Sequence, residues 1–431
     1  MPKKYLVCFI TLQLLFVIHS INSQSTSFIP TKRYEHSATF IGNKLYILGG
    51  LSLSPKVSAK TIGKEFFYLD FSASFDNQKL TWNDLTNINT VPSHFDGITA
   101  NGGIKNNTLF LFGGTSNGDN MDLVYTFDTQ MNSWNVPVIT GNANRKTNLF
   151  ASVDALGKIY YFNGFTFSSN SNELDFVILD TINFSWGRGN ITNAPSANQD
   201  YGSTILPNQN IIYLGGIFNG KPISLKVVYF YDTVNDIWTT KTTSGLVPSD
   251  RNSFSVVPGL DGQRIIIFGG IDVKENTESL YELDLTNFVW SIPTVTGKKP
   301  SNRHGHRANL IEKYMVISFG NDYNSDFESD ILLLDISNND EYKWTNFFQS
   351  SNDTSSLPTQ TDIPAPQKQS DNKIAIIGAI LGSLAGICLL TLGAFFLYKR
   401  TRNQGQGKVI PTPGDNFNNG QILLIPPERN I

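Results

Sequence analysis

Residues 264–290 read RIIIFGGIDVKENTESLYELDLTNFVW, and this stretch decides the fold. An apolar run ends in the glycine pair Gly269-Gly270, a second one ends at Asp284, and Trp290 follows six residues after that aspartate. Short runs of Val, Ile, Phe and Tyr bounded by Gly, Pro, Asn and Asp are typical of β-strands. With the apolar run before it, the segment predicts four strands, at residues 253–257, 264–268, 280–284 and 288–292.

The same pattern recurs along most of the chain. The six tryptophans are Trp82, Trp134, Trp186, Trp238, Trp290 and Trp344, with spacings of 52, 52, 52, 52 and 54 residues. Glycine pairs stand at 49–50, 113–114, 215–216 and 269–270, and degenerate copies stand at 163–164 and 320–321. Four antiparallel strands with one apolar face cannot bury that face alone, whereas stacking such units around an axis does. The repeat therefore predicts six blades.

This repeat resembles the kelch repeat, which has about 50 residues and four strands per blade. The resemblance covers roughly residues 30–347 and implies an all-β, six-bladed kelch-type β-propeller. We expect the glycines to serve backbone geometry and the tryptophans to pack between blades. The closure of the ring stays open at this stage, because residues 24–30 show no clear strand pattern.

The ends of the chain predict a membrane protein. Residues 1–23 resemble a secretory signal peptide, with Lys3 and Lys4 before a short apolar run. The propeller is expected at 24–348, a stalk rich in Ser, Thr and Pro at 349–372, a transmembrane helix at 373–398 and a cytoplasmic tail at 399–431. Basic residues directly after the helix stay on the cytoplasmic side. The pattern predicts a single-pass type I protein of the cell membrane, with the propeller outside.

Composition narrows the function classes. With 40% hydrophobic and 12% aromatic residues, the chain is not disordered. Its net charge of −3 gives no basic field for nucleic acid. Residues 24–372 hold 25 Lys and Arg against 34 Asp and Glu, a net charge of −9, and the tail carries 5 against 2. The two cysteines, Cys8 and Cys388, fall in the signal and the helix, so no disulfide is expected in the ectodomain.

One positional series indicates a ligand site. The residues just before the first strand of each unit are Arg33, His94, Arg145, Asn198, Arg251 and Arg303. The kelch resemblance implies that arginines in this slot hold acidic groups of a peptide partner, and a guanidinium binds a carboxylate through two hydrogen bonds. The series predicts a ring around one mouth of the channel. The alternative is that these arginines pair with carboxylates inside their blades.

Other clusters give weaker signals for chemistry. His304 and His306, with His36 of the neighbouring first unit, have the side chains of a zinc or copper site, but equivalent repeat slots favour a structural role. The acidic loop 322–330 resembles a calcium loop without its glycine, and a salt bridge to Arg303 or Arg33 is the alternative. Galactose oxidase shares a kelch-like propeller, but the ectodomain lacks the cysteine of its tyrosine cross-link. We expect no cofactor, no metal and no catalytic residue.

Further motifs concern modification and association. Sequons for N-glycosylation stand at Asn106, Asn183, Asn190 and Asn352. Gly378, Gly382 and Gly386 recur every four residues in the membrane helix, a spacing that lets two helices pair in a homodimer. The alternative is that small residues are common in membrane helices.

The sequence therefore predicts recognition rather than catalysis. We expect the arginine-bearing face to bind an extracellular protein or glycan in adhesion, sensing or assembly. The alternative is a carbohydrate-active ectodomain, since paired carboxylates for glycoside hydrolysis need only spatial proximity.

Overall fold

The structure is a computed structural model that describes residues 27–53, 60–118, 120–165, 174–196, 199–272, 279–322 and 327–353. The chain divides into one compact unit at 1–355 and a second at 356–431. The predicted signal peptide, transmembrane helix, tail, most of the stalk and Gly378, Gly382 and Gly386 lie outside the described residues. Within the described ranges, no helix is long and apolar enough to cross a membrane.

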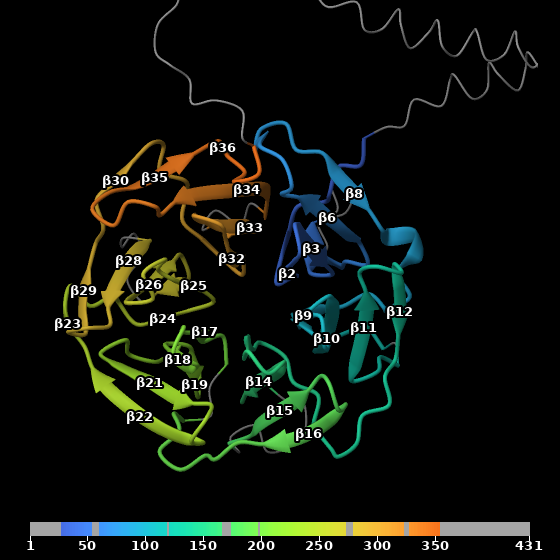
Figure 1. The fold of residues 1–431 in the computed structure, drawn as a ribbon, viewed down its shortest axis with the longest axis horizontal. Coiled ribbons are helices and arrows are strands. Elements are labelled where there is room, and N and C mark those ends of the chain that lie inside the picture. The colour runs from blue at the N-terminus through green and yellow to red at the C-terminus, as the bar shows by residue number, and fades with distance from the viewer. Residues whose placement is uncertain are drawn as a thin grey trace, which may run out of the picture. The chain divides into compact units, whose positions relative to one another are not determined.

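The described residues form the expected all-β propeller, with six sheets set around one axis (Figure 1). Blade 1 contains β2 (Ser37–Ile41), β3 (Lys44–Leu48), β6 (Phe66–Asp70) and β8 (Trp82–Asp84). Blade 2 contains β9 (Phe95–Gly102), β10 (Thr108–Thr115), β11 (Val124–Asp128) and β12 (Ser133–Asn135). Blade 3 contains β13 (Ala151–Val153), β14 (Lys158–Phe162), β15 (Phe176–Asp180) and β16 (Ser185–Arg188).

The second half of the ring repeats this order. Blade 4 contains β17 (Gly202–Ile205), β18 (Asn210–Leu214), β21 (Val227–Asp232) and β22 (Ile237–Thr242). Blade 5 contains β25 (Ser255–Pro258), β26 (Arg264–Phe268), β28 (Leu280–Asp284) and β29 (Val289–Ser291). Blade 6 contains β32 (Arg307–Ile311), β33 (Tyr314–Asp322), β34 (Phe327–Asp335) and β35 (Tyr342–Thr345). The predicted strands of unit five therefore agree with the structure to within two residues.

Short additional strands and one 3-10 turn complete the described fold. They are β1 (Arg33–Tyr34), β4 (Leu51–Leu53), β5 (Lys60–Ile62), β7 (Phe75–Asp76), η1 (Thr86–Ile88), β19 (Ile217–Phe218), β20 (Lys221–Pro222), β23 (Ser244–Gly245), β24 (Arg251–Asn252), β27 (Ile271–Asp272), β30 (Val295–Thr296), β31 (Arg303–His304) and β36 (Phe347–Phe348). The connectors β23 and β30 pair in parallel with the outer strands β29 and β35 of the blades that they enter. Each connector thus covers an edge that would otherwise offer free backbone groups.

The tryptophans pack between blades, as the sequence predicts. Each indole contacts the blade that precedes it around the ring: Trp82 contacts Phe319, Trp134 contacts Phe66, Trp186 contacts Phe112, Trp238 contacts Phe162, and Trp344 contacts Phe268, with ring centroids 4.9–5.8 Å apart. Trp290 donates its indole N–H to the carbonyl of Leu225 in blade 4 at 3.3 Å. The 52-residue spacing of the tryptophans therefore reflects one indole at each interface between neighbouring blades.

The glycine pairs serve the same interface. Gly49 adopts a left-handed φ of +67°, and a Cβ built on it would lie 2.6 Å from the carbonyl oxygen of His94 in the next blade. Glycine is the residue that accepts both this conformation and this close approach. In blade 6 the register differs from the predicted pair at 320–321, because Phe319 and Gly320 occupy the two left-handed positions.

The C-terminal segment closes the ring. Strand β36 pairs with β7 of blade 1, so the orange and blue ends of the propeller lie side by side (Figure 1). Phe348 is fully buried among Phe71, Phe75 and Tyr314, with ring centroids 4.9–5.2 Å away. We call this contact the clasp. At the N-terminal end, no strand forms at 27–32. At the C-terminal end, the packing continues past the predicted boundary at 348, since Asp353 accepts a hydrogen bond from the backbone N–H of Ser74 at 3.0 Å.

The clasp predicts a sharp difference between two adjacent phenylalanines. Phe348→Ala should reduce the free energy of unfolding of the full chain by about 3–5 kcal/mol, because it removes a fully buried aromatic ring. Phe347 is 48% exposed, so Phe347→Ala should cost less than about 1 kcal/mol. Denaturant unfolding followed by tryptophan fluorescence measures both. Equal losses in the two variants would contradict closure by the clasp.

Candidate functional site

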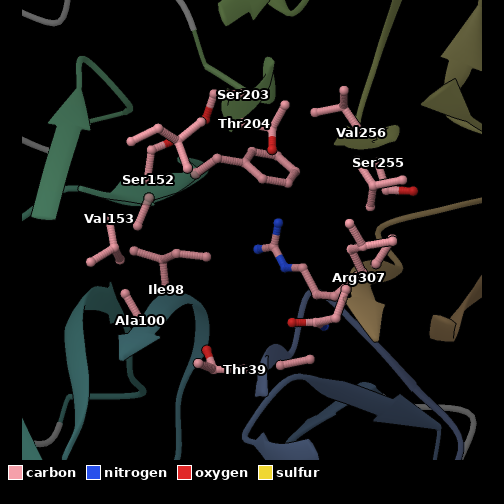
Figure 2. Close-up of a pocket in the computed structure, with 18 of the residues that line it drawn as sticks. Thr39, Ile98, Ala100, Ser152, Val153, Ser203, Thr204, Ser255, Val256 and Arg307 are labelled. Atoms are coloured by element: carbon pink, nitrogen blue, oxygen red, sulfur yellow. The ribbon is translucent and has the colours of Figure 1, made fainter. Parts of the chain in front are cut away.

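The first strands of all six blades surround a central cavity of about 300 Å³. Its wall carries many small polar groups, and Figure 2 shows Thr39, Ser152, Ser203, Thr204 and Ser255 around it. The hydroxyl oxygens of Ser152 and Ser203 and the amide nitrogen of Asn309 are buried and lack hydrogen-bond partners among the described residues. Because buried polar groups in proteins are normally paired, this cavity is suited to polar contents.

Arg307 projects into this cavity from β32 (Figure 2). The side chain is 9% exposed, its Nε donates to the carbonyl of His36 at 2.9 Å, and its guanidinium carbon lies 4.7 Å from the ring centroid of Phe150. Its two terminal nitrogens have no hydrogen-bond partner within the described part of the chain. Burial lowers the pKa of Arg307, and the nearby charges of Asp96, Asp200 and Glu35 oppose that shift.

Above the cavity, one residue from each blade contributes to a ring that we call the collar: Glu35, Asp96, Asn148, Asp200, Ser253 and Gly305. All six have left-handed φ values, from +53° to +62°. Backbone N–H groups donate from one member to the carbonyl of the member before it, for example from Asp96 to Glu35 at 3.0 Å and from Glu35 to Gly305 at 2.8 Å. Five such bonds occur among the described residues, and the bond from Glu35 to Gly305 joins blade 1 to blade 6.

Three of the collar residues are acidic. Asp96 is 7% exposed, and burial raises its pKa well above the ordinary range, with further contributions from the negative charges of Glu35 and Asp200. Burial also raises the pKa of Asp200, whose carboxylate accepts hydrogen bonds from the amide of Asn148 at 3.2 and 3.4 Å. The positive charge of Arg307 lowers both pKa values in part. The collar therefore brings three carboxyl groups close together, one of them buried and two half-buried.

The arginines predicted to line the mouth are directed into their blades instead. Arg33, Arg251 and Arg303 are 1–2% exposed. Their guanidinium groups donate to the carbonyl at the end of the second strand, at 2.8 Å to Gly49, 3.0 Å to Gly269 and 3.2 Å to Phe319. Each also pairs with a carboxylate: Arg33 with Glu65, Arg251 with Asp272 at 3.7 Å, and Arg303 with Asp330 at 2.7 Å. Ligand binding by these residues stays a prediction, but each has a structural partner.

The other members of the predicted series differ from one another. His94 is buried, with Nδ1 2.8 Å from the carbonyl of Pro92. In unit three the position equivalent to Arg33 is Lys146, whose ammonium lies 3.4 Å from Asp175 and whose carbonyl accepts from Gly114. Arg145 reaches back to blade 2 and donates to the carbonyls of Gly113, at 3.1 Å, and Met121. Asn198 lies outside the described residues.

The histidines also serve blade interfaces. His36 Nε2 lies 2.9 Å from the hydroxyl of Ser318 in blade 6, and His306 Nε2 lies 2.8 Å from the hydroxyl of Ser255 in blade 5. The two rings therefore belong to different interfaces. In the described ranges, no group of three or more His, Cys, Asp or Glu side chains is arranged to hold a metal ion. The acidic loop 322–330 contributes the predicted salt bridge, from Asp330 to Arg303.

Two sequons lie on the face opposite the collar. Asn106 is exposed in the turn between β9 and β10, and Asn183 is exposed in the turn between β15 and β16. Asn183 donates its amide to Asp180 at 2.9 Å, as Asn235 does to Asp232 and Asn287 to Asp284, so this asparagine also stabilises a repeated turn. The amide of Asn190 donates to the carbonyl of Asp236 at 3.1 Å, and Asn352 is exposed after the clasp.

The sequence pattern predicted neither the collar nor the position of Arg307 in the channel. In every unit except the third, the predicted residue stands two positions before the collar residue, and in the third unit Arg145 stands three positions before Asn148. Three acidic residues in six equivalent positions, at 35, 96 and 200, were a usable signal. Arg307 stands where other units have Ser37, Ile98, Phe150, Gly202 and Ser255, so no repeat pattern marks it.

Comparisons with known proteins agree with this geometry. Residues 68–260 and 259–360 match a family model described as the KLHDC2/KLHL20/DRC7 Kelch-repeats domain. Kelch domain-containing protein 3 of Rattus norvegicus is 22% identical over 335 residues, which cover 71% of this chain and 85% of that protein. Acyl-CoA-binding domain-containing protein 5 of Arabidopsis thaliana is 27% identical over 218 residues, 48% of this chain and 33% of that protein. A solved structure titled "Structure of YjhT" has a TM-score of 0.55 at 12% identity, covering 74% of this chain and 98% of that chain, and this likeness shows the fold alone.

The buried arginine pairs predict a stability effect. Arg251→Ala should reduce the free energy of unfolding by about 3–5 kcal/mol, because it leaves the buried carboxylate of Asp272 without its cation. Arg188→Ala is the matched control, since this arginine is 55% exposed in its ion pair with Asp175 and should contribute less than about 1 kcal/mol. Denaturant unfolding measures both. Similar losses of unfolding free energy in the two variants would show that the buried ion pair contributes no more to stability than the exposed one.

The buried histidines predict a dependence of stability on pH. Burial lowers the pKa of His94 to about 4 and the pKa values of His36 and His306 well below their ordinary range. Only the unfolded chain then binds protons as the pH falls below about 6.5, so this part of the stability is complete above that pH and is lost below it. Asp96 and Asp200 act in the opposite direction, because their pKa values are raised in the folded chain.

A single-histidine variant isolates this effect from the aspartates. Between pH 6.5 and 5, wild type should lose about 1.7 kcal/mol more stability than His306→Gln, because the unfolded histidine goes from half to almost fully protonated while the folded one stays neutral. Denaturant unfolding at both pH values gives the difference. Parallel pH dependences in the two proteins would contradict a neutral buried histidine at this interface.

Proposed function

The chain belongs to the kelch-repeat family described by the KLHDC2/KLHL20/DRC7 model, and from that premise we propose that it is a protein-recognition propeller whose partner binds the collar face. Kelch propellers generally serve as protein-binding scaffolds, and the relatives that match most of this chain carry the kelch name. The proposal gives the propeller that role at a cell surface, in adhesion, sensing or assembly.

One observation carries the choice of face. At the collar end of the channel, no donor among the described residues bonds to the Asp96 carboxylate, and the terminal nitrogens of Arg307 have no acceptor there. These atoms keep their hydrogen-bonding capacity for a bound partner. A surface with unpaired hydrogen-bond donors and acceptors is suited to binding a polar partner.

The sequons support the same face. Glycans on Asn106 and Asn183 would cover the opposite end of the propeller, which holds the turns between first and second strands and between third and fourth strands. The collar end holds the connectors between blades and the loops between second and third strands, and it is free of these two sequons. Loops on a rigid scaffold commonly carry binding residues.

The location at a membrane is part of the proposal and rests on sequence. The signal-like segment at 1–23 and the uncharged run at 374–398 favour one membrane crossing with the propeller outside. The small-residue spacing at Gly378, Gly382 and Gly386 favours a homodimer through that helix. A net charge of −9 on residues 24–372 gives the external part an acidic field that attracts basic partners.

Site-directed blocking tests the face and the location together. The two natural cysteines lie outside the propeller, so a new cysteine at an exposed lysine provides a unique external label. Lys32→Cys places the label three residues before the collar residue Glu35, and Lys105→Cys places it in the β9–β10 turn on the opposite face. A membrane-impermeant polyethylene glycol maleimide applied to intact expressing cells should label both variants. Only the label on Lys32→Cys should reduce capture of biotinylated cell-surface proteins, by at least tenfold.

Wild-type cells treated with the same maleimide control for the natural cysteines. Equal capture by the two labelled variants would overturn recognition at the collar face. Labelling of both variants only after permeabilisation would overturn the external location.

A further inference from the structure

We propose that the collar binds one positively charged organic group, the ammonium of a lysine or the guanidinium of an arginine, among the carboxylates of Glu35, Asp96 and Asp200. This inference rests on the proposed function, since the collar face is the face assigned to the partner, and it names the chemistry that the partner presents there. It replaces the sequence expectation of an acidic partner group, because the arginines behind that expectation are paired inside their blades.

Backbone geometry fixes the position of the carboxylates. Glu35, Asp96 and Asp200 occupy the same place in blades 1, 2 and 4, with φ values of +54°, +55° and +53°. Their N–H groups donate to neighbouring collar carbonyls at 2.8–3.0 Å, so the backbone that carries each side chain is held by the ring. The three carboxylates therefore surround the channel axis from different sides, and little ordering cost remains when a ligand binds.

Asp96 has no hydrogen-bond donor among the described residues. Its side chain is more than nine-tenths buried, yet no side-chain or backbone donor among the described residues bonds to its carboxylate. A buried carboxylate normally accepts several hydrogen bonds or pairs with a cation. Within the described part of the chain, the Asp200 carboxylate receives hydrogen bonds only from Asn148, and those are long, at 3.2 and 3.4 Å. Both side chains therefore retain acceptor capacity for an incoming donor.

The charged groups around the collar favour a positively charged ligand. Arg307 contributes one positive charge near the three carboxylates, and it forms no ion pair with Asp96 or Asp200 within 4.0 Å. Burial and the negative charges of Glu35 and Asp200 raise the pKa of Asp96, so a cation placed among these groups would favour its ionised form. A second cation relieves the repulsion among these groups, whereas an anion entering through the collar meets it.

The shape of the donor set favours an organic cation. An ammonium carries three N–H donors and a guanidinium carries five, and both direct them toward several acceptors at once. Carboxylates on three separate blades suit such a spread of donors. The cavity below, with its unpaired Ser152 and Ser203 hydroxyls, leaves room for the end of a long side chain.

Capped pentapeptides that differ only in their central residue test the charge. We would titrate the full chain with peptides that carry lysine, arginine, acetyl-lysine or glutamate between glycines, at low ionic strength, and follow binding by fluorescence anisotropy. The lysine and arginine peptides should bind at least tenfold more tightly than the acetyl-lysine and glutamate peptides. Asp96→Asn and Asp200→Asn should each weaken lysine binding at least tenfold.

Asp340→Asn is the matched control. Asp340 is exposed in the turn between β34 and β35 on the opposite face, so this variant removes one negative charge without touching the collar, and lysine binding should not change. Equal binding of lysine and acetyl-lysine peptides, no binding of the lysine and arginine peptides at millimolar concentration, or equal weakening by Asp340→Asn would overturn the inference. Blocking at Lys32→Cys reports on the proposed function separately, because it depends on the face and not on the charge of the partner group.

Discussion

The backbone hydrogen bond between neighbouring blades is the interaction on which the rest of this structure depends. It occurs at two levels. At the collar, five of the six N–H groups donate to the carbonyl of the blade before them. At the end of the second strand, four glycines donate to carbonyls of the blade after them: Gly50 to His94, Gly114 to Lys146, Gly216 to Arg251 and Gly270 to Arg303. Such contacts require backbones to approach closely, which explains the glycine pairs and the left-handed residues. They also explain the buried arginines, which satisfy carbonyls of the strand ends that carry the glycines.

The closure of the ring and the candidate site share residues. His36 contacts blade 6 through Ser318, and its own carbonyl accepts from Arg307, so the first and last blades together hold the guanidinium in the channel. The clasp lies at the outer edge of the same pair of blades. Opening of this interface would therefore displace Arg307 and the collar bond from Glu35 to Gly305 together. Stability and the proposed recognition site are therefore linked at this one blade interface.

The repeat made the fold predictable, and the departures from the repeat made the site hard to predict. Tryptophans every 52 residues and glycine pairs report interfaces that every blade must form, so they identify six blades from sequence alone. Whether Arg33 faces solvent or Glu65 depends on side-chain direction, which a linear pattern does not encode. Arg307 and the clasp phenylalanine Phe348 have no counterparts in the other blades. A search for repeated residues therefore does not find them. The register shift at Phe319 has the same origin, because the interface of blades 6 and 1 is the one that closes.

Native-state hydrogen exchange of the collar amides tests the central claim most directly. If the collar bonds hold the blades together, the amides of Glu35, Asp96, Asp200, Ser253 and Gly305 exchange together, and only when the whole propeller unfolds. Mass spectrometry of peptides that contain these positions should then give one common free energy, equal to that of global unfolding. A Glu35 amide that exchanges much faster than the other four would mean that blades 1 and 6 separate in the folded protein, and it would contradict this account of both the ring and the site.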